Sequence, residues 1–125
     1  MKAFLDTHVA VYLGSGETSE LGYRGLDLVE RAALFVSPAV RLELAFLSEL
    51  RRIRASADQV LGALAGDLGV RVAADPFDSV VTEAMAIGWT RDPFDRLIVA
   101  TAALHRSPLI TRDRRVLDNF ADAVW

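Results

Sequence analysis

The sequence of 125 residues contains no cysteine, which excludes disulfide bonds, thiolate nucleophiles and cysteine-ligated zinc sites. It also lacks a long apolar run, since no stretch approaches the about 20 residues that a membrane-spanning helix needs. Asp6 interrupts the apolar N-terminus MKAFLDTHVAVYL, and no small-residue cleavage site follows it, so a signal peptide is not expected. We therefore expect a cytoplasmic protein without a membrane segment.

Basic residues other than arginine are scarce. Lys2 is the only lysine among 14 basic residues, and there are two histidines, His8 and His105. The net charge of −3 argues against a generally basic surface that would bind nucleic acid indiscriminately. Two groups of arginines still allow local contacts with nucleic acid, or are simply solvated helix ends: Arg51, Arg52 and Arg54, and Arg112, Arg114 and Arg115.

The length of the chain predicts a single domain over residues 1–125. Hydrophobic residues make up 52% of the sequence, and the mean hydropathy is +0.26. This apolar share is slightly high for a monomeric domain, which indicates that another chain covers part of the surface.

Short apolar runs alternate with longer helical patterns, as is typical of an α/β fold with a mostly parallel sheet between two layers of helices. Ser37 and Pro38 supply an N-cap and a first helical residue. The stretch Gly14–Gly22 has the composition of a surface loop. The expected strands are Ala3–Leu5, Leu34–Val36, Val70–Ala73, Leu109–Thr111 and a possible edge strand Ala123–Trp125. The expected helices are Gly22–Ala33, Pro38 to about Ile53, Ala57–Leu68, Phe77–Ile87 and Pro93–Arg106.

Two aspartates follow predicted strands. Asp6 comes directly after Ala3–Leu5, and Asp113 stands two residues beyond Leu109–Thr111. In open α/β sheets, ligands bind outside the carboxyl ends of the strands. Taken singly, an aspartate in such a position is more often a turn residue or a helix cap.

Glu43 falls within the helical stripe of Val40, Phe46, Leu47 and Leu50, so we expect its carboxyl group to face the core. Burying an unpaired charge is costly. Glu43 must therefore be protonated, paired with an arginine or bound to a cation.

The segment RDPFDR places two aspartates at the start of the helix Pro93–Arg106. Asp92 suits the N-cap, and Asp95 in the first turn gains from the helix dipole. Asp95 also lies beside the apolar face of this helix, along the boundary of the core. We assign Asp92 a capping or supporting role and retain Asp95 as a candidate site residue.

If Asp6, Glu43, Asp95 and Asp113 meet, their mutual repulsion requires raised pKa values or a bound cation. All-oxygen ligands suit Mg²⁺ or Mn²⁺. The two histidines, His8 and His105, are too few and too far apart in sequence to suggest zinc, and we expect each to be structural or at the surface. Such a cation can activate water against a phosphodiester. Hydrolysis of a phosphodiester is then the natural chemistry.

The segments FLDTHV, SPAVRLELA, RDPFDRLIVATA and LITRD together resemble the PIN domain, and especially the VapC-type toxin ribonucleases of toxin–antitoxin pairs. The resemblance spans nearly the whole chain, with the segments in family order. It implies a metal-dependent endoribonuclease, a small antitoxin partner and a homodimer. It also implies that Asp6, Glu43 and Asp95 hold a first metal ion, and that Asp113 completes the site or binds a second metal ion or water. Thr7 and Thr111 match hydroxyl positions that border the site, or are simply polar residues of a turn and a strand.

Three other readings compete with this one. A receiver-like or dehalogenase-like phosphotransfer domain needs a lysine beside the phosphoryl group, and the only lysine lies upstream of the first strand. A dinucleotide site fails because Ser19 occupies the third glycine position of the motif begun by Gly14 and Gly16. A PIN-like binding module without catalysis stays open. The arginines Arg51, Arg112 and Arg114 are candidates for contacts with backbone phosphates.

Overall fold

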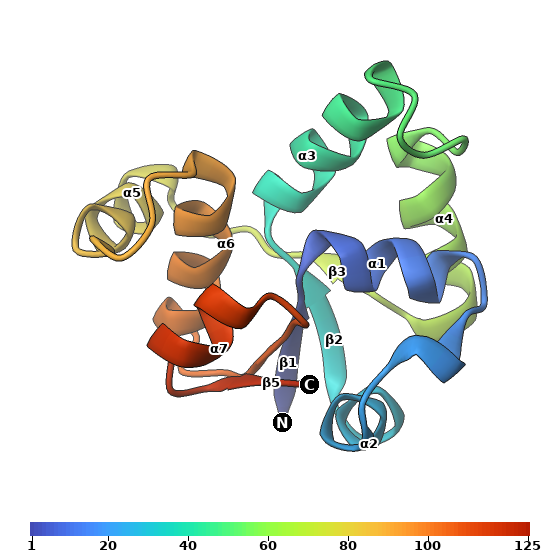
Figure 1. Cartoon of the computed structure of the whole chain (residues 1–125), viewed down its shortest axis with the longest axis horizontal. Helices are drawn as coiled ribbons and strands as arrows, with labels where there is room; N and C mark the ends of the chain where they lie inside the picture. The colour runs from blue at the N-terminus through green and yellow to red at the C-terminus, as the bar shows by residue number, and fades with distance from the viewer.

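The computed structural model describes residues 1–125 and has a five-stranded, all-parallel sheet at its centre (Figure 1). All five strands expected from the sequence are present, and each has only two to four residues. Their bounds are β1 Lys2–Leu5, β2 Ala33–Val36, β3 Arg71–Val72, β4 Leu109–Ile110 and β5 Ala123–Val124.

The strand order is β3-β2-β1-β4-β5, so the chain moves outward from β1 in one direction and returns to the other side of β1 for β4. Phe4 is aligned with Phe35 of β2 and with Leu109 of β4. The order reverses between β1 and β4. This topological switch point is where α/β folds place their ligands.

Seven helices and one short 3-10 helix connect the strands. Right-handed crossovers in opposite directions place α1, α2 and α4 on one side of the sheet and α5, α6 and α7 on the other, so that the fold is an α/β/α sandwich as expected (Figure 1). The bounds are α1 Thr7–Gly14, η1 Thr18–Glu20, α2 Tyr23–Arg31, α3 Pro38–Glu49, α4 Ala57–Leu68, α5 Phe77–Met85, α6 Pro93–Leu104 and α7 Arg114–Asn119.

Two helices, α1 and α7, were not expected from the sequence. Helix α1 buries Thr7, Val9, Ala10 and Leu13. Its own residues are apolar on most sides of the helix, so the sequence shows no amphipathic pattern there. Helix α7 has six residues, too few to display a helical period. The 3-10 helix η1 lies within the stretch expected to be a loop.

The expected end of α3 at about Ile53 is wrong, because the helix ends at Glu49. Arg51 has a φ of 58°, which turns the chain out of the helix, and the Arg52 N–H donates to the Leu47 carbonyl at 2.9 Å. No glycine marks this left-handed position in the sequence, so the helical pattern runs on past the true end.

The expected core-facing stripe of α3 is also wrong in part. Val40 and Leu44 are buried, whereas Phe46 and Leu50 are exposed. The helix projects beyond the sheet from the end of β2, so its later turns have less of the molecule to pack against (Figure 1). Glu43 consequently lies half-buried at the boundary of the core.

The main core contains 22 buried apolar residues from the sheet and the helices on both sides of it. On the α2 side the C-terminal residue is packed tightly, because a Cβ atom on Gly22 would lie 2.6 Å from the Trp125 carbonyl carbon. The Gly25 N–H donates to the Trp125 carbonyl at 2.8 Å. None of the helices combines the length and apolar character needed to cross a bilayer.

Candidate functional site

Asp6 lies at the carboxyl end of β1 and caps α1. Its Oδ1 accepts a hydrogen bond from the Thr7 backbone N–H at 2.8 Å, and its Oδ2 accepts one from the Thr111 hydroxyl at 2.6 Å. Only 6% of the residue is exposed. Two hydrogen bonds therefore fix this buried carboxylate in one orientation.

Asp113 lies close to Asp6 because β1 and β4 are neighbours in the sheet. The Thr111 hydroxyl, which donates to Asp6, also accepts a hydrogen bond from the Asp113 N–H at 3.1 Å. The Asp113 carboxylate caps α7 through the backbone N–H groups of Arg115 and Val116. Capping and convergence thus occur together here, although from the sequence they looked like alternatives.

Glu43 reaches the same region from α3. Its carboxylate accepts a hydrogen bond from the Thr7 hydroxyl, one residue after Asp6. Burial raises the pKa of Glu43, with further increases from the charges of Asp6 and Asp92, while the Thr7 hydrogen bond lowers it. No arginine forms an ion pair with Glu43.

Asp95 is the most strongly perturbed carboxyl group of the site. Burial is the largest cause, followed by the charges of Asp92, Asp6, Asp113 and Glu43, and together they raise the pKa of Asp95 to about 7. Its carboxylate accepts no hydrogen bond, because the neighbouring Asp92 takes the capping N–H groups of Phe94 and Asp95. Asp95 is therefore a half-buried acid that no other group of the chain stabilises.

These acids share one electrostatic field, yet no three carboxylate or imidazole groups lie close enough together to ligate a single cation. A shared cation therefore requires some of these side chains to move closer together. The Asp95 carboxylate accepts no hydrogen bond that would restrain it, whereas the Glu43 carboxylate accepts one from the Thr7 hydroxyl. The donor set is all oxygen and negatively charged, which fits Mg²⁺ or Mn²⁺.

His8 also borders the site, although the sequence gave no reason to place it there. Its Nδ1 lies 3.8 Å from Asp6 Oδ2, and its Nε2 accepts a hydrogen bond from the Arg112 backbone N–H at 2.9 Å. Burial lowers the pKa of His8, with a further lowering from Arg112, against opposite effects of Asp6 and Asp113. The neutral imidazole thus ties the loop that carries Asp113 to the start of α1.

Lys2 lies at the opposite end of β1 from Asp6. Its Nζ is 3.4 Å from His105 Nδ1 and 5.4 Å from the centre of the Phe35 ring. The phosphotransfer reading needs a lysine at the acids and is therefore wrong for this chain.

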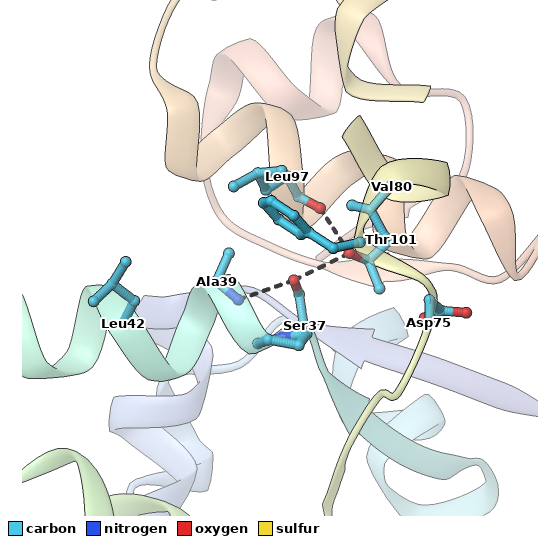
Figure 2. Close-up of a pocket in the computed structure, with 9 residues that line it drawn as sticks. Ser37, Ala39, Leu42, Asp75, Val80, Leu97 and Thr101 are labelled. Carbon is cyan, nitrogen blue, oxygen red and sulfur yellow. Dashed lines mark hydrogen bonds between the residues drawn. The ribbon is translucent and has the colours of Figure 1, made fainter. Parts of the chain in front are cut away.

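A separate cavity of about 230 Å³ lies between α3, α5 and α6 (Figure 2). At its floor the Thr101 hydroxyl donates to Ser37 Oγ at 3.0 Å, and Ser37 Oγ accepts from the Ala39 N–H at 3.1 Å. Asp75 at its edge is paired with His105 Nε2 at 2.9 Å. Since the polar groups already have partners, the cavity presents an apolar wall and no catalytic group.

Comparison with known proteins supports the fold and the family. A toxin–antitoxin complex from Klebsiella pneumoniae contains a chain that is 20% identical, with a TM-score of 0.66, over 98% of this chain and 96% of that one. VapBC2 from Rickettsia felis, bound to a DNA fragment from its promoter, matches at 17% identity and a TM-score of 0.68, over 99% and 96%. No curated protein is similar enough in sequence to count as a match. The PIN domain profile matches residues 3–123, and the chain therefore belongs to the PIN domain family.

Proposed function

We propose that this PIN domain is an endoribonuclease that depends on Mg²⁺ or Mn²⁺ and acts as the VapC-type toxin of a toxin–antitoxin pair. The observation that carries the proposal is the raised pKa of Asp95, to which Asp6, Glu43 and Asp113 all contribute. Titratable groups perturbed by burial and by like charges gather at functional sites. They do so here at the switch point of the sheet.

In this proposal Asp6, Glu43 and Asp95 hold a first cation, and Asp113 completes the site or holds a second. The Thr111 hydroxyl group donates to Asp6 and accepts from the Asp113 N–H, and so holds these two residues near each other. The Thr7 hydroxyl group holds Glu43 near the start of α1. When bound, the cation lowers the pKa of a water molecule and neutralises charge on the phosphodiester. The carboxylates would position the cation and the water molecule.

The test compares cleavage of a structured RNA by the wild type, Asp6→Asn and Asp95→Asn, each with Mg²⁺ and with chelator. Asp122→Asn is the matched control, because Asp122 is exposed and its charge is not among those that raise the pKa of Asp95. Cutting that needs Mg²⁺, survives in the control and is lost in both site variants supports the enzyme. Equal activity in all four proteins identifies a contaminating nuclease and removes the proposal.

A PIN-like binding module without catalysis is the second candidate. It is favoured by the hydrogen bond that holds Glu43 on Thr7 and by the absence of three groups within ligand range of one cation. Titration of the wild type with Mn²⁺ separates the two candidates. No binding at millimolar Mn²⁺, together with no cleavage, favours the binding module.

An antitoxin partner is part of the proposal, because one of the solved structures described above is a toxin–antitoxin complex by name and the other is VapBC2. The test is co-expression of the chain with a candidate short antitoxin. A stable complex in which RNA cleavage is lost, and recovered when the two chains are separated, supports the pairing. Full cleavage by the complex contradicts it.

A homodimer is the remaining part of the proposal, and we assign its interface to the outer face of α3 and α5. Leu42, Phe46 and Leu50 repeat every four residues along the exposed side of α3, and on α5 Phe77 and Met85 are 70% and 76% exposed. Leu42 and Phe77 also line the cavity of Figure 2. Projecting apolar side chains beside an apolar cavity suit a self-complementary interface.

The mass of the protein in solution tests this interface. The wild type is expected to be a dimer and Phe77→Glu a monomer. Tyr23→Glu is expected to stay a dimer, because Tyr23 is even more exposed than Phe77 but lies on α2. A monomeric wild type, or a dimeric Phe77→Glu variant, would remove the assignment. Light scattering coupled to size exclusion gives the mass directly.

A further inference from the structure

The side chains of Tyr12, Arg112 and Trp125 form a cluster at the edge of the carboxylate site, which we call the arginine platform. We propose that the arginine platform binds one unpaired base of the RNA, in the nucleotide next to the phosphate that is cut. This inference rests on the proposed function and adds to it a binding site for one base of the RNA substrate.

The guanidinium group of Arg112 is held in place before any ligand arrives. Its Cζ lies 5.4 Å from the centre of the Tyr12 ring and 5.8 Å from that of Trp125. Its Nη2 donates to the Tyr12 hydroxyl at 2.6 Å, and its backbone N–H donates to His8. Because the side chain is already ordered, a ligand that contacts it gives up little further conformational entropy.

The contacts of Arg112 favour a base over a phosphate as its ligand. One edge of the guanidinium is occupied by the Tyr12 hydroxyl, and Glu20 Oε2 lies 3.8 Å from Nη1 and would repel a phosphate there. The Arg112 side chain is nevertheless 53% exposed. Unpaired bases stack on aromatic rings and on guanidinium planes, and this contact needs no free N–H group.

The arginine platform adjoins the carboxylates through the chain itself. Arg112 stands between Thr111, whose hydroxyl donates to Asp6, and Asp113. His8 bridges the two regions, since it contacts the Arg112 backbone on one side and lies 3.8 Å from Asp6 on the other. A base on the arginine platform therefore belongs to a nucleotide adjoining the phosphate at the acids. Paired bases inside a duplex expose no face to it, which selects unpaired RNA.

The position of Trp125 is fixed by α2. Gly22 and Gly25 leave room for the Trp125 backbone, and a Cβ atom on Gly22 would lie 2.7 Å from the ring carbon Cδ1. The Gly25 N–H holds the Trp125 carbonyl. The tryptophan is thus a rigid support for Arg112.

The experiment measures binding without cleavage, in the Asp95→Asn background with chelator present. This background is suitable because the Asp95 carboxylate makes no hydrogen bond to the loop that carries Arg112. The probes are labelled oligouridine of about ten nucleotides, within the span that single-strand sites cover, and an abasic oligomer of the same length. Fluorescence anisotropy gives both dissociation constants.

We expect oligouridine to bind at least about fivefold more tightly than the abasic oligomer, at the low end of what base stacking contributes. Arg112→Lys keeps the positive charge but removes the planar guanidinium group, so this variant should bind the two oligomers equally tightly. Arg115→Lys is the control, because Arg115 is exposed, lies in the same group of arginines and contacts no aromatic ring. Equal binding of the two oligomers, or a preference that Arg112→Lys retains, overturns the arginine platform but leaves RNA binding intact. If neither oligomer binds, the proposed function fails as well.

A second readout needs no change in the arginine platform. In the Asp95→Asn, Trp89→Phe background, Trp125 is the only tryptophan. Oligouridine should quench its fluorescence, and the abasic oligomer should not. Binding of oligouridine without any change in the emission of Trp125 would overturn the proposal.

Discussion

Asp95→Asn should stabilise the cation-free protein at pH 8, although the aspartate belongs to the candidate site. The pKa of Asp95 is raised to about 7 in the fold, first by burial and then by four neighbouring acids. An unfolded chain ionises an aspartate near pH 3.9. Between about pH 4 and 7 the folded protein therefore holds a proton that the unfolded chain releases, and stability falls as the pH rises.

The difference between a pKa of about 7 in the fold and the unfolded value near 3.9 corresponds to about 4 kcal/mol, and screening by water at this half-buried position reduces the expected effect to about 1–2 kcal/mol. Asparagine removes the charge and keeps the shape. The melting temperature of Asp95→Asn should therefore exceed that of the wild type by about 3–8 °C at pH 8 and equal it at pH 4.

The assay is thermal unfolding by calorimetry between pH 4 and 8.5, in chelator and then in Mg²⁺. Mg²⁺ should raise the melting temperature of the wild type and close the difference from the variant, because it binds the folded site only. Asp122→Asn serves as the exposed control. A variant less stable than the wild type at pH 8 in chelator, or a difference that does not change with pH, would refute the electrostatic reasoning.

Three further substitutions test the packing around the site. Thr111→Val should lower the free energy of unfolding, measured in urea, by about 1–3 kcal/mol, because it leaves Asp6 Oδ2 and the Asp113 N–H without their shared partner. An unchanged midpoint of unfolding would contradict this. Gly22→Ala should lower the free energy of unfolding by about 1–3 kcal/mol, because the added methyl group displaces Trp125. The displacement should be visible as a red shift of the Trp125 emission, and an unshifted spectrum would count against the close contact. Leu44→Ala should lower the free energy of unfolding by about 2–5 kcal/mol, because this fully buried leucine anchors α3. A decrease of less than about 1 kcal/mol would show that it does not.

Local patterns in the sequence located most elements. The β-branched and apolar runs predicted all five strands, and Ser37-Pro38 and Asp92-Pro93 predicted the starts of α3 and α6. The same rules missed α1, which is apolar on most sides, and carried α3 too far, because Arg51 takes a left-handed conformation without being glycine.

The candidate acids could be proposed from the sequence because each stands at a strand end or within a helical pattern. Their proximity could not be derived in the same way, since it depends on β1 lying between β2 and β4. Of the arginine platform, the sequence indicated only Arg112, as a candidate contact for backbone phosphates. Its members Tyr12, Arg112 and Trp125 come from α1, the loop after β4 and the end of the chain.

The amino-acid sequence by itself determined the alternation of strands and helices, the absence of thiol chemistry and the family resemblance, because these depend on neighbouring residues and on composition. Only the tertiary structure decided which acids share a field, that Lys2 lies far from them, and that Phe46 and Leu50 face outward. The physical reason is that burial and electrostatic coupling depend on distances through space, and strand order sets those distances between residues that are far apart along the chain.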